Sequence, residues 1–183
     1  MRYFIAFFIT MGLIFLLVVL LFGGGKSKTP PTVKTLASYA STNAEAQLTI
    51  DGPINANQNH QQVQINVGRD DVTLEQLQGY DGDVTSMQNY ANTQNAYANF
   101  LLALAHAGFT LGNNDPKSAD ERGFCPLGDR YVFQLTQDGK DIERYWATSC
   151  GSPKTYLGAL DLTISLFKAQ VPNYGKQTQN FIL

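Results

Sequence analysis

The sequence predicts an α+β fold with an antiparallel sheet, preceded by one membrane-spanning helix. Residues 3–22 form an uncharged apolar run. Two stretches, around 48–78 and 131–149, alternate apolar and polar side chains as half-buried strands do. Apolar residues recur at three- and four-residue spacing over 85–107 and 152–171, which is typical of amphipathic helices. We therefore expect the order β-β-β-α-β-β-α, with both helices packed on one face of the sheet.

The apolar run is the strongest single signal. Twenty residues in a helix span about 30 Å, the thickness of the hydrocarbon core of a bilayer. We assign residues 1–22 to a transmembrane helix that contacts the lipid bilayer through residues 3–22. A cleaved signal peptide is the alternative, because Gly23 and Gly25 are small enough for a cleavage site, although signal cores usually span only about 7 to 15 residues. Residues 23–36 are rich in Gly, Lys and Pro, and we expect a flexible tether there.

The remaining chain divides into a domain at 37–174 and a polar C-terminal tail at 175–183. Three strands open the domain, with apolar alternation at residues 48–50, 63–67 and 72–74 and turns between them. A helix is predicted over 85–107, capped by Asp83 or Thr85 and stopped at Gly108. A second helix is predicted from Ser152 as its cap to Pro172 as its stop, with Pro153 at its first position.

A β-hairpin is predicted between these two helices. The Asp138-Gly139 pair suits a two-residue turn, which would place Leu135 opposite Ile142, Phe133 opposite Arg144 and Tyr131 opposite Trp146. The expected core face consists of Tyr131, Phe133, Leu135, Ile142 and Trp146, and Arg144 is the one misfit.

Cys125 and Cys150 flank the open end of that hairpin, within possible bridging distance of each other. We favour a disulfide, which would stabilise the fold by roughly 3 to 4 kcal/mol. A reduced structural pair, or a reactive or metal-binding role, remains open. Disulfides persist outside the reducing cytoplasm.

Two kinds of observation disagree about the direction in which the predicted helix inserts into the membrane. Lys26, Lys28 and Lys34 follow the apolar run, whereas only Arg2 precedes it, so the positive-inside rule alone would leave the domain in the cytoplasm. The paired cysteines favour the opposite side. So does the surface chemistry, since 27 Asn and Gln residues outnumber the 13 Lys and Arg. We expect a single-pass membrane protein with its C-terminal domain outside the cytoplasm.

Charge and motifs exclude several classes of function. From residue 35 onward, nine basic side chains face fifteen acidic ones, and this net charge of −6 argues against nucleic-acid binding. The two histidines, His60 and His106, have no catalytic partners nearby in sequence, and the spacings of zinc sites and of the common nucleotide and hydrolase motifs are missing. We therefore predict no enzyme activity, no catalytic residues, no metal and no cofactor.

One surface could bind a ligand. The helix predicted at 85–107 carries four asparagines beside two tyrosines, residue types that stack on sugars and bond their hydroxyls: Asn89, Tyr90, Asn92, Asn95, Tyr97 and Asn99. The alternative is that both tyrosines belong to the core and the asparagines form a neutral solvent face. Four asparagines on one helix are unusual, because Asn is a poor helix former.

Three segments carry a resemblance to a known group: GFCPLGDRY at 123–131, YWATSC at 145–150 and QVPNY at 170–174. They resemble uncharacterised single-pass membrane proteins of candidate-phylum bacteria of the Saccharibacteria type. The likeness covers the anchor and the whole outer domain and implies no activity, cofactor or site residue. It adds to the expectation of a bacterial envelope protein with Cys125 and Cys150 paired.

Together these features predict a membrane-anchored, extracytoplasmic binding or scaffolding module of the cell envelope. Its expected partners are an envelope protein or cell-wall glycan. The alternatives are an envelope enzyme with an unrecognised carboxylate site and a subunit of a pilus or secretion system.

Overall fold

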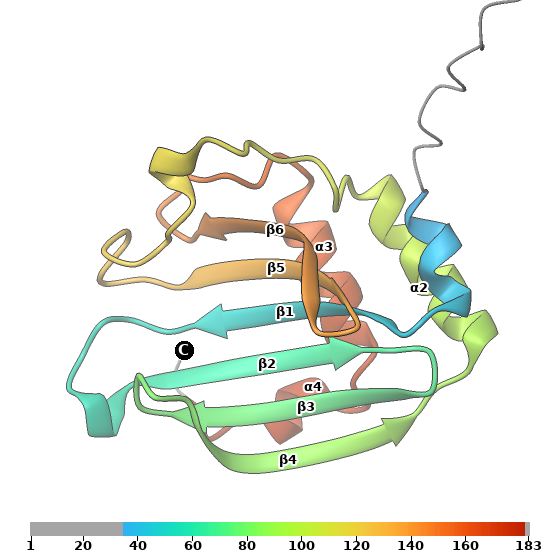
Figure 1. The fold of residues 1–183 in the computed structure, drawn as a ribbon. Helices are drawn as coiled ribbons and strands as arrows, with labels where there is room; N and C mark the ends of the chain where they lie inside the picture. Colours follow the sequence, from blue (N-terminus) through green and yellow to red (C-terminus); the bar gives the residue numbers. More distant parts are fainter. Residues whose placement is uncertain (1–34, 182–183) are drawn as a thin grey trace, which may run out of the picture. The chain divides into compact units, whose positions relative to one another are not determined.

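A six-stranded antiparallel sheet runs through residues 35–181, the part of the chain that this computed structural model describes (Figure 1). The strand order across the sheet is β4-β3-β2-β1-β5-β6. The strands are β1 Ala44–Asp51, β2 Gln61–Val67, β3 Asp71–Gln78, β4 Asp83–Ala91, β5 Arg130–Gln137 and β6 Lys140–Thr148. The α+β class and the first three predicted strands are confirmed.

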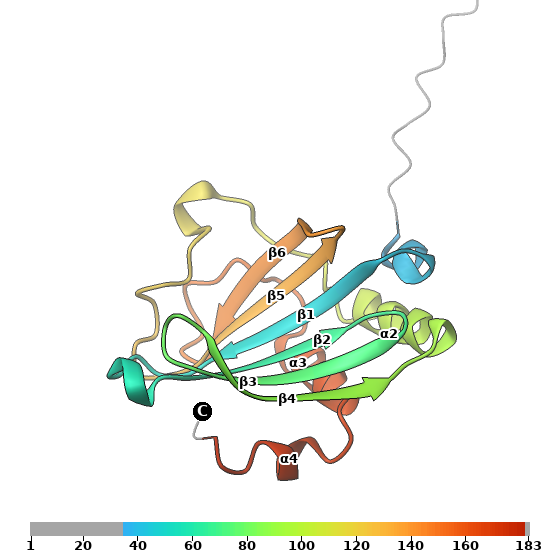
Figure 2. The same ribbon diagram turned by 60° about the horizontal axis from the view of Figure 1, so that its bottom comes forward.

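Helices α2, Gln94–His106, and α3, Leu160–Ala169, cover one face of this sheet (Figures 1 and 2). A short helix α4, Tyr174–Gln177, follows, and 3-10 turns occur at η1 Leu36–Ser41, η2 Asn57–Asn59 and η3 Pro116–Ser118. Thr93 caps α2 by accepting a hydrogen bond from the Ala96 N–H. The predicted stop at Gly108 is confirmed, since its φ of 80° breaks the helix and the Phe109 N–H bonds the Leu104 carbonyl.

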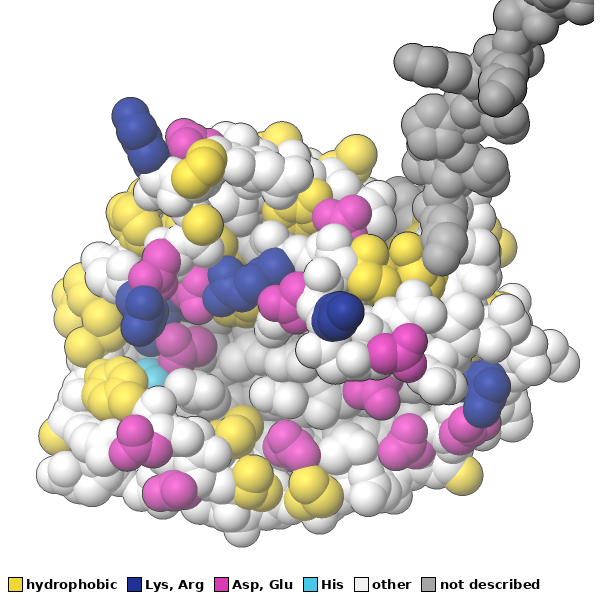
Figure 3. All heavy atoms as spheres, in the orientation of Figure 1, with side chains coloured by type: hydrophobic (Ala, Val, Ile, Leu, Met, Phe, Trp, Pro, Cys, Tyr) yellow, Lys and Arg dark blue, Asp and Glu magenta, His cyan; other side chains and the backbone are white. Residues whose placement is uncertain are grey.

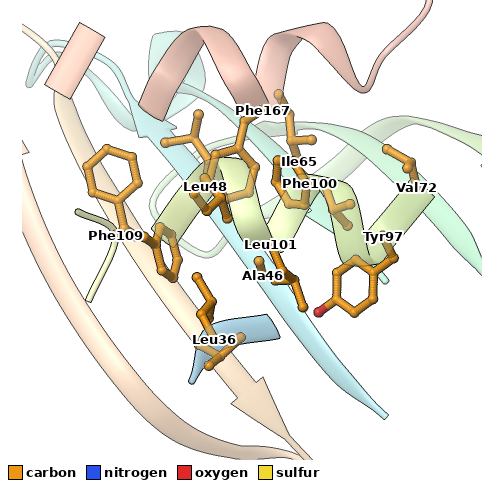
Figure 4. Close-up of a cluster of buried hydrophobic side chains, with 14 of the residues drawn as sticks. Leu36, Ala46, Leu48, Ile65, Val72, Tyr97, Phe100, Leu101, Phe109 and Phe167 are labelled. Carbon is orange, nitrogen blue, oxygen red and sulfur yellow. The ribbon is translucent and has the colours of Figure 1, made fainter. Parts of the chain in front are cut away.

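The core lies between the sheet and these helices (Figure 4). Leu48 on β1 and Ile65 on β2 alternate inward with polar neighbours and meet Leu101 of α2 and Phe167 of α3. Phe167 packs edge-on against Phe100, with 5.2 Å between ring centroids. Burial of apolar side chains such as these is the dominant favourable contribution to folding.

The long helix predicted at 85–107 is wrong in its first half. Residues 83–91 form β4, an edge strand that pairs with β3, so the order of strands and α-helices is β-β-β-β-α-β-β-α-α. Gly79 and Gly82 make a turn with positive φ and return the chain along β3. Pairing with β3 satisfies one edge of the backbone of this polar segment, and the helix begins only after the cap at Thr93.

The second predicted helix begins later than the sequence indicates. α3 starts at Leu160 rather than at Pro153. The N–H groups of Thr155 and Tyr156 instead donate to the Trp146 carbonyl, and Tyr156 forms a β-bridge with Gly112. Residues 155–156 are thus extended along the edge of the sheet at β6. Within the predicted span, Phe167 and Val171 are buried, whereas Leu157, which precedes α3, is 59% exposed.

The predicted hairpin register is wrong by one residue beyond the turn. Asp138 and Gly139 form the expected two-residue turn, but a bulge at Ile142 places Leu135 opposite Glu143 and Tyr131 opposite Ala147. A one-residue shift moves side chains to the other face of a sheet. Trp146 therefore leaves the predicted core face, and Arg144 is no misfit, because both side chains lie on the opposite face.

No helix within residues 35–181 is long and apolar enough to cross a membrane. The transmembrane helix predicted at residues 1–22 lies outside the described residues, as does most of the predicted tether. Residues of the predicted tail contact the sheet: the Gln177 carbonyl accepts a hydrogen bond from Gln76 of β3, and the side chain of Gln177 bonds Gln88 of β4.

Candidate functional site

The face of the sheet that carries neither α2 nor α3 is lined by every second residue of each strand (Figure 1). The register aligns these side chains in rows that cross β2, β1 and β5: Gln62, Asp51 and Arg130; Gln64, Thr49 and Val132; Asn66, Gln47 and Gln134. Amide and hydroxyl groups supply most of these positions. We call this surface the open face, because neither α2 nor α3 covers it. Several of its amides bond neighbouring side chains, since Gln64 donates to Asn66 and Gln134 donates to Asp141.

A covering loop, residues 113–129, lies over the β5–β6 end of the open face. Phe124 stacks on Trp146 of β6 with 5.3 Å between ring centroids, and the Trp146 Nε1–H donates to the Ser118 carbonyl at 2.7 Å. Arg144 donates to both carboxylate oxygens of Glu121, at 2.8 and 2.7 Å. These contacts hold the loop on the sheet.

The predicted disulfide is confirmed and anchors the same loop. Cys125 in the covering loop bonds Cys150, which follows β6, with 5.8 Å between the Cα atoms. Gly128 lies against the bridge, and a Cβ on Gly128 would approach Cys125 Sγ to 2.8 Å. The loop therefore has a fixed covalent attachment at its far end.

Two adjoining cavities form a groove between the covering loop and the open face. One measures about 350 Å³ and is lined by Asp51, Ile54, Gln62, Tyr80, Glu121, Arg122, Gly123 and Arg130. The other measures about 210 Å³ and is lined by Thr49, Asp51, Gln62, Gln64, Glu121, Val132, Gln134 and Arg144. Asp51, Gln62 and Glu121 line both, so we treat them as one polar groove. Figure 3 shows a hollow across this face, bordered by charged side chains.

A buried ionic network forms the closed end of the polar groove. The Arg130 guanidinium donates from Nε to Asp51 Oδ2 and from Nη2 to the Gly52 carbonyl at 2.7 Å, and Nη2 also lies 2.7 Å from Asp51 Oδ2. His60 Nε2 lies 2.7 Å from Asp51 Oδ1, and His60 Nδ1 lies 3.2 Å from the Pro53 carbonyl. Asp51 thus contacts two basic side chains. Both are buried, since Arg130 is only 2% exposed and His60 is 0% exposed.

Tyr80 covers this network from the turn between β3 and β4. Its ring stacks on His60 with 4.0 Å between centroids and an interplanar angle of 16°. Its hydroxyl donates to the Asn55 carbonyl and accepts from the Asn55 N–H, while its own N–H donates to Asn57. Hydrogen bonds thus hold Tyr80 at its hydroxyl and at its backbone, yet the residue is 49% exposed.

The ionisable side chains of the polar groove are already engaged within the protein. Both carboxylates already accept hydrogen bonds from an arginine, Asp51 from Arg130 and Glu121 from Arg144. His60 is enclosed beneath Tyr80 and is not positioned to exchange protons with a ligand. Among residues 35–181, no group of His, Cys, Asp and Glu side chains is arranged to hold a metal ion.

At the rim of the polar groove, Asp120 and Arg122 form an exposed ion pair. Hydrogen bonds from the Arg122 side chain and N–H lower the pKa of Asp120 to about 2. The rim thus carries compensated charge at neutral pH.

No protein-family model matches this chain, and no curated protein matches it. The geometry of the polar groove therefore carries the functional argument.

The six residues predicted as a binding surface do not form one surface. Asn89 lies on β4 at the edge of the open face, beside Thr73, whereas Tyr90 points to the helix side and bonds Gln88. Asn92 precedes α2 and donates to the Gly68 carbonyl. The prediction that all six share one helix is wrong. Asn89 and Tyr90 lie on β4, and Asn92 lies between β4 and α2.

The remaining three residues do lie on α2. Asn95 and Asn99 are exposed on the helix, on the opposite side of the sheet from the polar groove. Tyr97 is a core residue, fully buried, and its hydroxyl donates to the Ala44 carbonyl at 2.7 Å. The alternative reading, in which the tyrosine is core and the asparagines face solvent, describes this helix.

Sequence reasoning missed the groove residues Asp51, Tyr80, Glu121 and Arg130. A signal for Asp51 was present, since the alternation that buries Leu48 and Ile50 directs Asp51 to the opposite face. The pairing of β1 with β5, which brings Asp51 and Arg130 together over 79 positions, had no local signal.

Proposed function

We propose that this chain is a membrane-anchored, extracytoplasmic binding module of the cell envelope that holds a neutral, hydrogen-bonding ligand in the polar groove. The observation that carries the proposal is the groove itself: two adjoining cavities on the sheet, lined by three glutamines and by two acidic and three basic side chains. Concave sites that combine a fixed floor with a few placed polar groups are the usual form of ligand sites.

The lining favours an uncharged ligand. Gln62, Gln64 and Gln134 each present both a carbonyl acceptor and an N–H donor, which complements hydroxyl and amide groups. The carboxylates and guanidiniums of the groove neutralise one another in pairs. Within the groove, a strongly anionic or cationic partner would therefore meet paired charges and no patch of a single sign.

One observation favours an enzyme: two carboxylates, Asp51 and Glu121, line both cavities of the polar groove. A carboxylate pair that acts as acid and base needs two different environments, one favouring the protonated and one the ionised form. Here both carboxyl groups have the same kind of partner, an arginine. Binding therefore has the stronger support.

A comparison of two amide-deleting double variants tests the binding proposal. Q64A/Q134A removes amides from the polar groove, and N95A/N99A removes two exposed amides from α2. The full-length chain in detergent is incubated with soluble cell-wall glycan fragments and, separately, with solubilised envelope proteins. We expect Q64A/Q134A to lose binding and N95A/N99A to retain it. The reverse pattern, or retention by both, contradicts the proposal.

The location proposed for the domain has its own test. Cys150 becomes a free thiol when the disulfide is reduced, and it lies on an exposed turn. In intact cells a membrane-impermeant thiol reagent should label it after reduction and not before. Labelling only after the cells are permeabilised would place the domain in the cytoplasm.

A further inference from the structure

The end of the polar groove at Tyr80 combines an exposed aromatic ring with buried polar groups that have hydrogen-bonding capacity left over. One face of the Tyr80 ring is occupied by His60, so the exposed area belongs to the other face and the edges. Three hydrogen bonds to Asn55 and Asn57 fix the ring where it borders the larger cavity. A fixed, half-exposed ring is a stacking platform that loses little entropy on binding.

Arg130 supplies the unused polar capacity. Its Nε and Nη2 groups bond Asp51 and Gly52, but Nη1 has no acceptor among the described residues, although Arg130 is almost fully buried and lines the same cavity. Asp51 Oδ1, in the same cavity, also makes no hydrogen bond to a described residue, although His60 Nε2 lies 2.7 Å away. Unpaired buried polar groups are costly, so a bound oxygen atom at this point would stabilise the site.

Charge restricts the class of ligand. Asp51 and Glu121 line this cavity and disfavour an anion, while Arg122 and Arg130 disfavour a cation. A ligand that matches the site has a face of polarised C–H groups for the ring, whose π-face is negative, and oxygen atoms at its edge that both donate and accept. A pyranose ring has both properties.

We infer that the Tyr80–Arg130 end of the polar groove is a subsite for one ring of a neutral oligosaccharide. The sugar stacks on the exposed face of Tyr80, and its hydroxyls meet Arg130 Nη1 and the side chain of Gln62. The adjoining cavity lined by Gln64 and Gln134 continues the path, so further sugar units follow along the sheet. This inference rests on the proposed function and specifies its ligand.

Binding of defined oligosaccharides to the full-length chain tests the inference. The probes are cellohexaose, maltohexaose and chitohexaose, and the chain is kept in a zwitterionic detergent because sugar detergents would compete. We expect at least one probe to bind, with affinity about tenfold weaker for Tyr80→Ala and changed less than threefold for Tyr80→Phe, which keeps the ring. Leu102→Ala, an exposed position on α2, should leave affinity unchanged.

Tyr80 also covers His60, so Tyr80→Ala is compared only if its melting curve remains cooperative. A second measurement needs no variant: nuclear Overhauser contacts between the Tyr80 ring protons and sugar C–H protons are expected in the wild type. A bound probe without these contacts, or with equal affinity for a folded Tyr80→Ala, overturns the subsite.

Two further outcomes separate this inference from the proposed function. If no oligosaccharide binds but an envelope protein does, and Q64A/Q134A abolishes that binding, the sugar assignment is overturned while the groove keeps its proposed role. If Q64A/Q134A changes the binding of no ligand that the wild type binds, both are overturned.

Discussion

Asp51 and Arg130 stand directly opposite each other on β1 and β5, and their side chains form a nearly buried ion pair with 2.7 Å between Oδ2 and Nη2. His60 contacts the other carboxylate oxygen at 2.7 Å. One carboxylate thus contacts two buried basic side chains at the closed end of the polar groove. This arrangement makes the groove wall sensitive to single substitutions.

Asp51→Asn should be strongly destabilising. It leaves the buried guanidinium of Arg130 without its charge partner, and breaking a buried ion pair from one side typically costs about 3 to 5 kcal/mol. The measurement is urea unfolding of the wild type and the variant. The double variant D51N/R130M removes the uncompensated charge as well and should recover part of the loss. No recovery would mean that lost packing, and not the uncompensated charge, causes most of the destabilisation.

Replacing both cysteines by serine should lower stability without abolishing the fold. The bridge closes a loop over 25 positions, which corresponds to about 3.5 kcal/mol in the chain-entropy model. Differential scanning calorimetry measures the change. Reductant should shift the wild type toward the variant and leave the variant itself unmoved, because the chain has two cysteines in all. Equal melting temperatures for the oxidised wild type and the variant contradict a stabilising bridge.

Trp146 should report on the covering loop. It is the one tryptophan of the chain, and Phe124 stacks on it. Phe124→Ala should expose the indole of Trp146 and shift its fluorescence emission to longer wavelength, in a variant that still melts cooperatively. Leu127→Ala is the matched control, since Leu127 lies in the same loop but is 89% exposed. An unchanged spectrum in Phe124→Ala would show that the loop does not depend on this stack.

Glu45→Gln should stabilise the protein at pH 7 and not at pH 3. Partial burial, and next the nearby Asp71, raise the pKa of Glu45 above its usual 4.5. The folded state therefore favours the neutral carboxyl, so this group's stability contribution is present at low pH and lost as the pH rises through the folded pKa. Thermal melts at both pH values measure the difference between variant and wild type.

Asp70→Asn provides a control of opposite sign. A hydrogen bond from Arg69 lowers the pKa of Asp70, so its contribution is present at neutral pH and lost on acidification through the folded pKa. This substitution should slightly destabilise at pH 7 and have no effect at pH values well below the folded pKa. A stabilising effect of both substitutions at pH 7 would contradict these local environments.

Gly112→Ala should destabilise severely. A Cβ at this position would lie 2.0 Å from Cδ1 of the buried Tyr145, so the ring or the Gly112 bridge to Tyr156 must move. Gly175→Ala in α4 is the control, because no atom lies within 4 Å of its added Cβ. Comparable melting temperatures for the two variants would contradict the packing at Gly112.

Local periodicity was sufficient for part of this fold. The alternation at Leu48, Ile65 and Leu74 identified β1 to β3, and the turn at Asp138 and Gly139 was also local. The β-bulge at Ile142 was not, because one extra residue leaves no mark in the composition of the strand but reverses the faces of Arg144 and Trp146.

The candidate site was harder to predict from the sequence, because it too depends on contacts between distant residues. The asparagine-rich segment around Asn89 has apolar spacing that suits a helix, and only its pairing with β3 shows it to be a strand. The polar groove depends on β1 meeting β5 and on a covering loop placed by Trp146 and a disulfide. Such non-local contacts follow from the tertiary arrangement and not from neighbouring residues.

The most direct test of the binding account is an NMR titration that follows the side-chain amide signals of the full-length chain as soluble cell-wall glycan fragments are added. The account predicts saturable shifts of the Gln62, Gln64 and Gln134 amides in the polar groove, while Asn95 and Asn99 on α2 stay unmoved. Saturable binding that shifts Asn95 and Asn99 and leaves the three glutamines unchanged would contradict it.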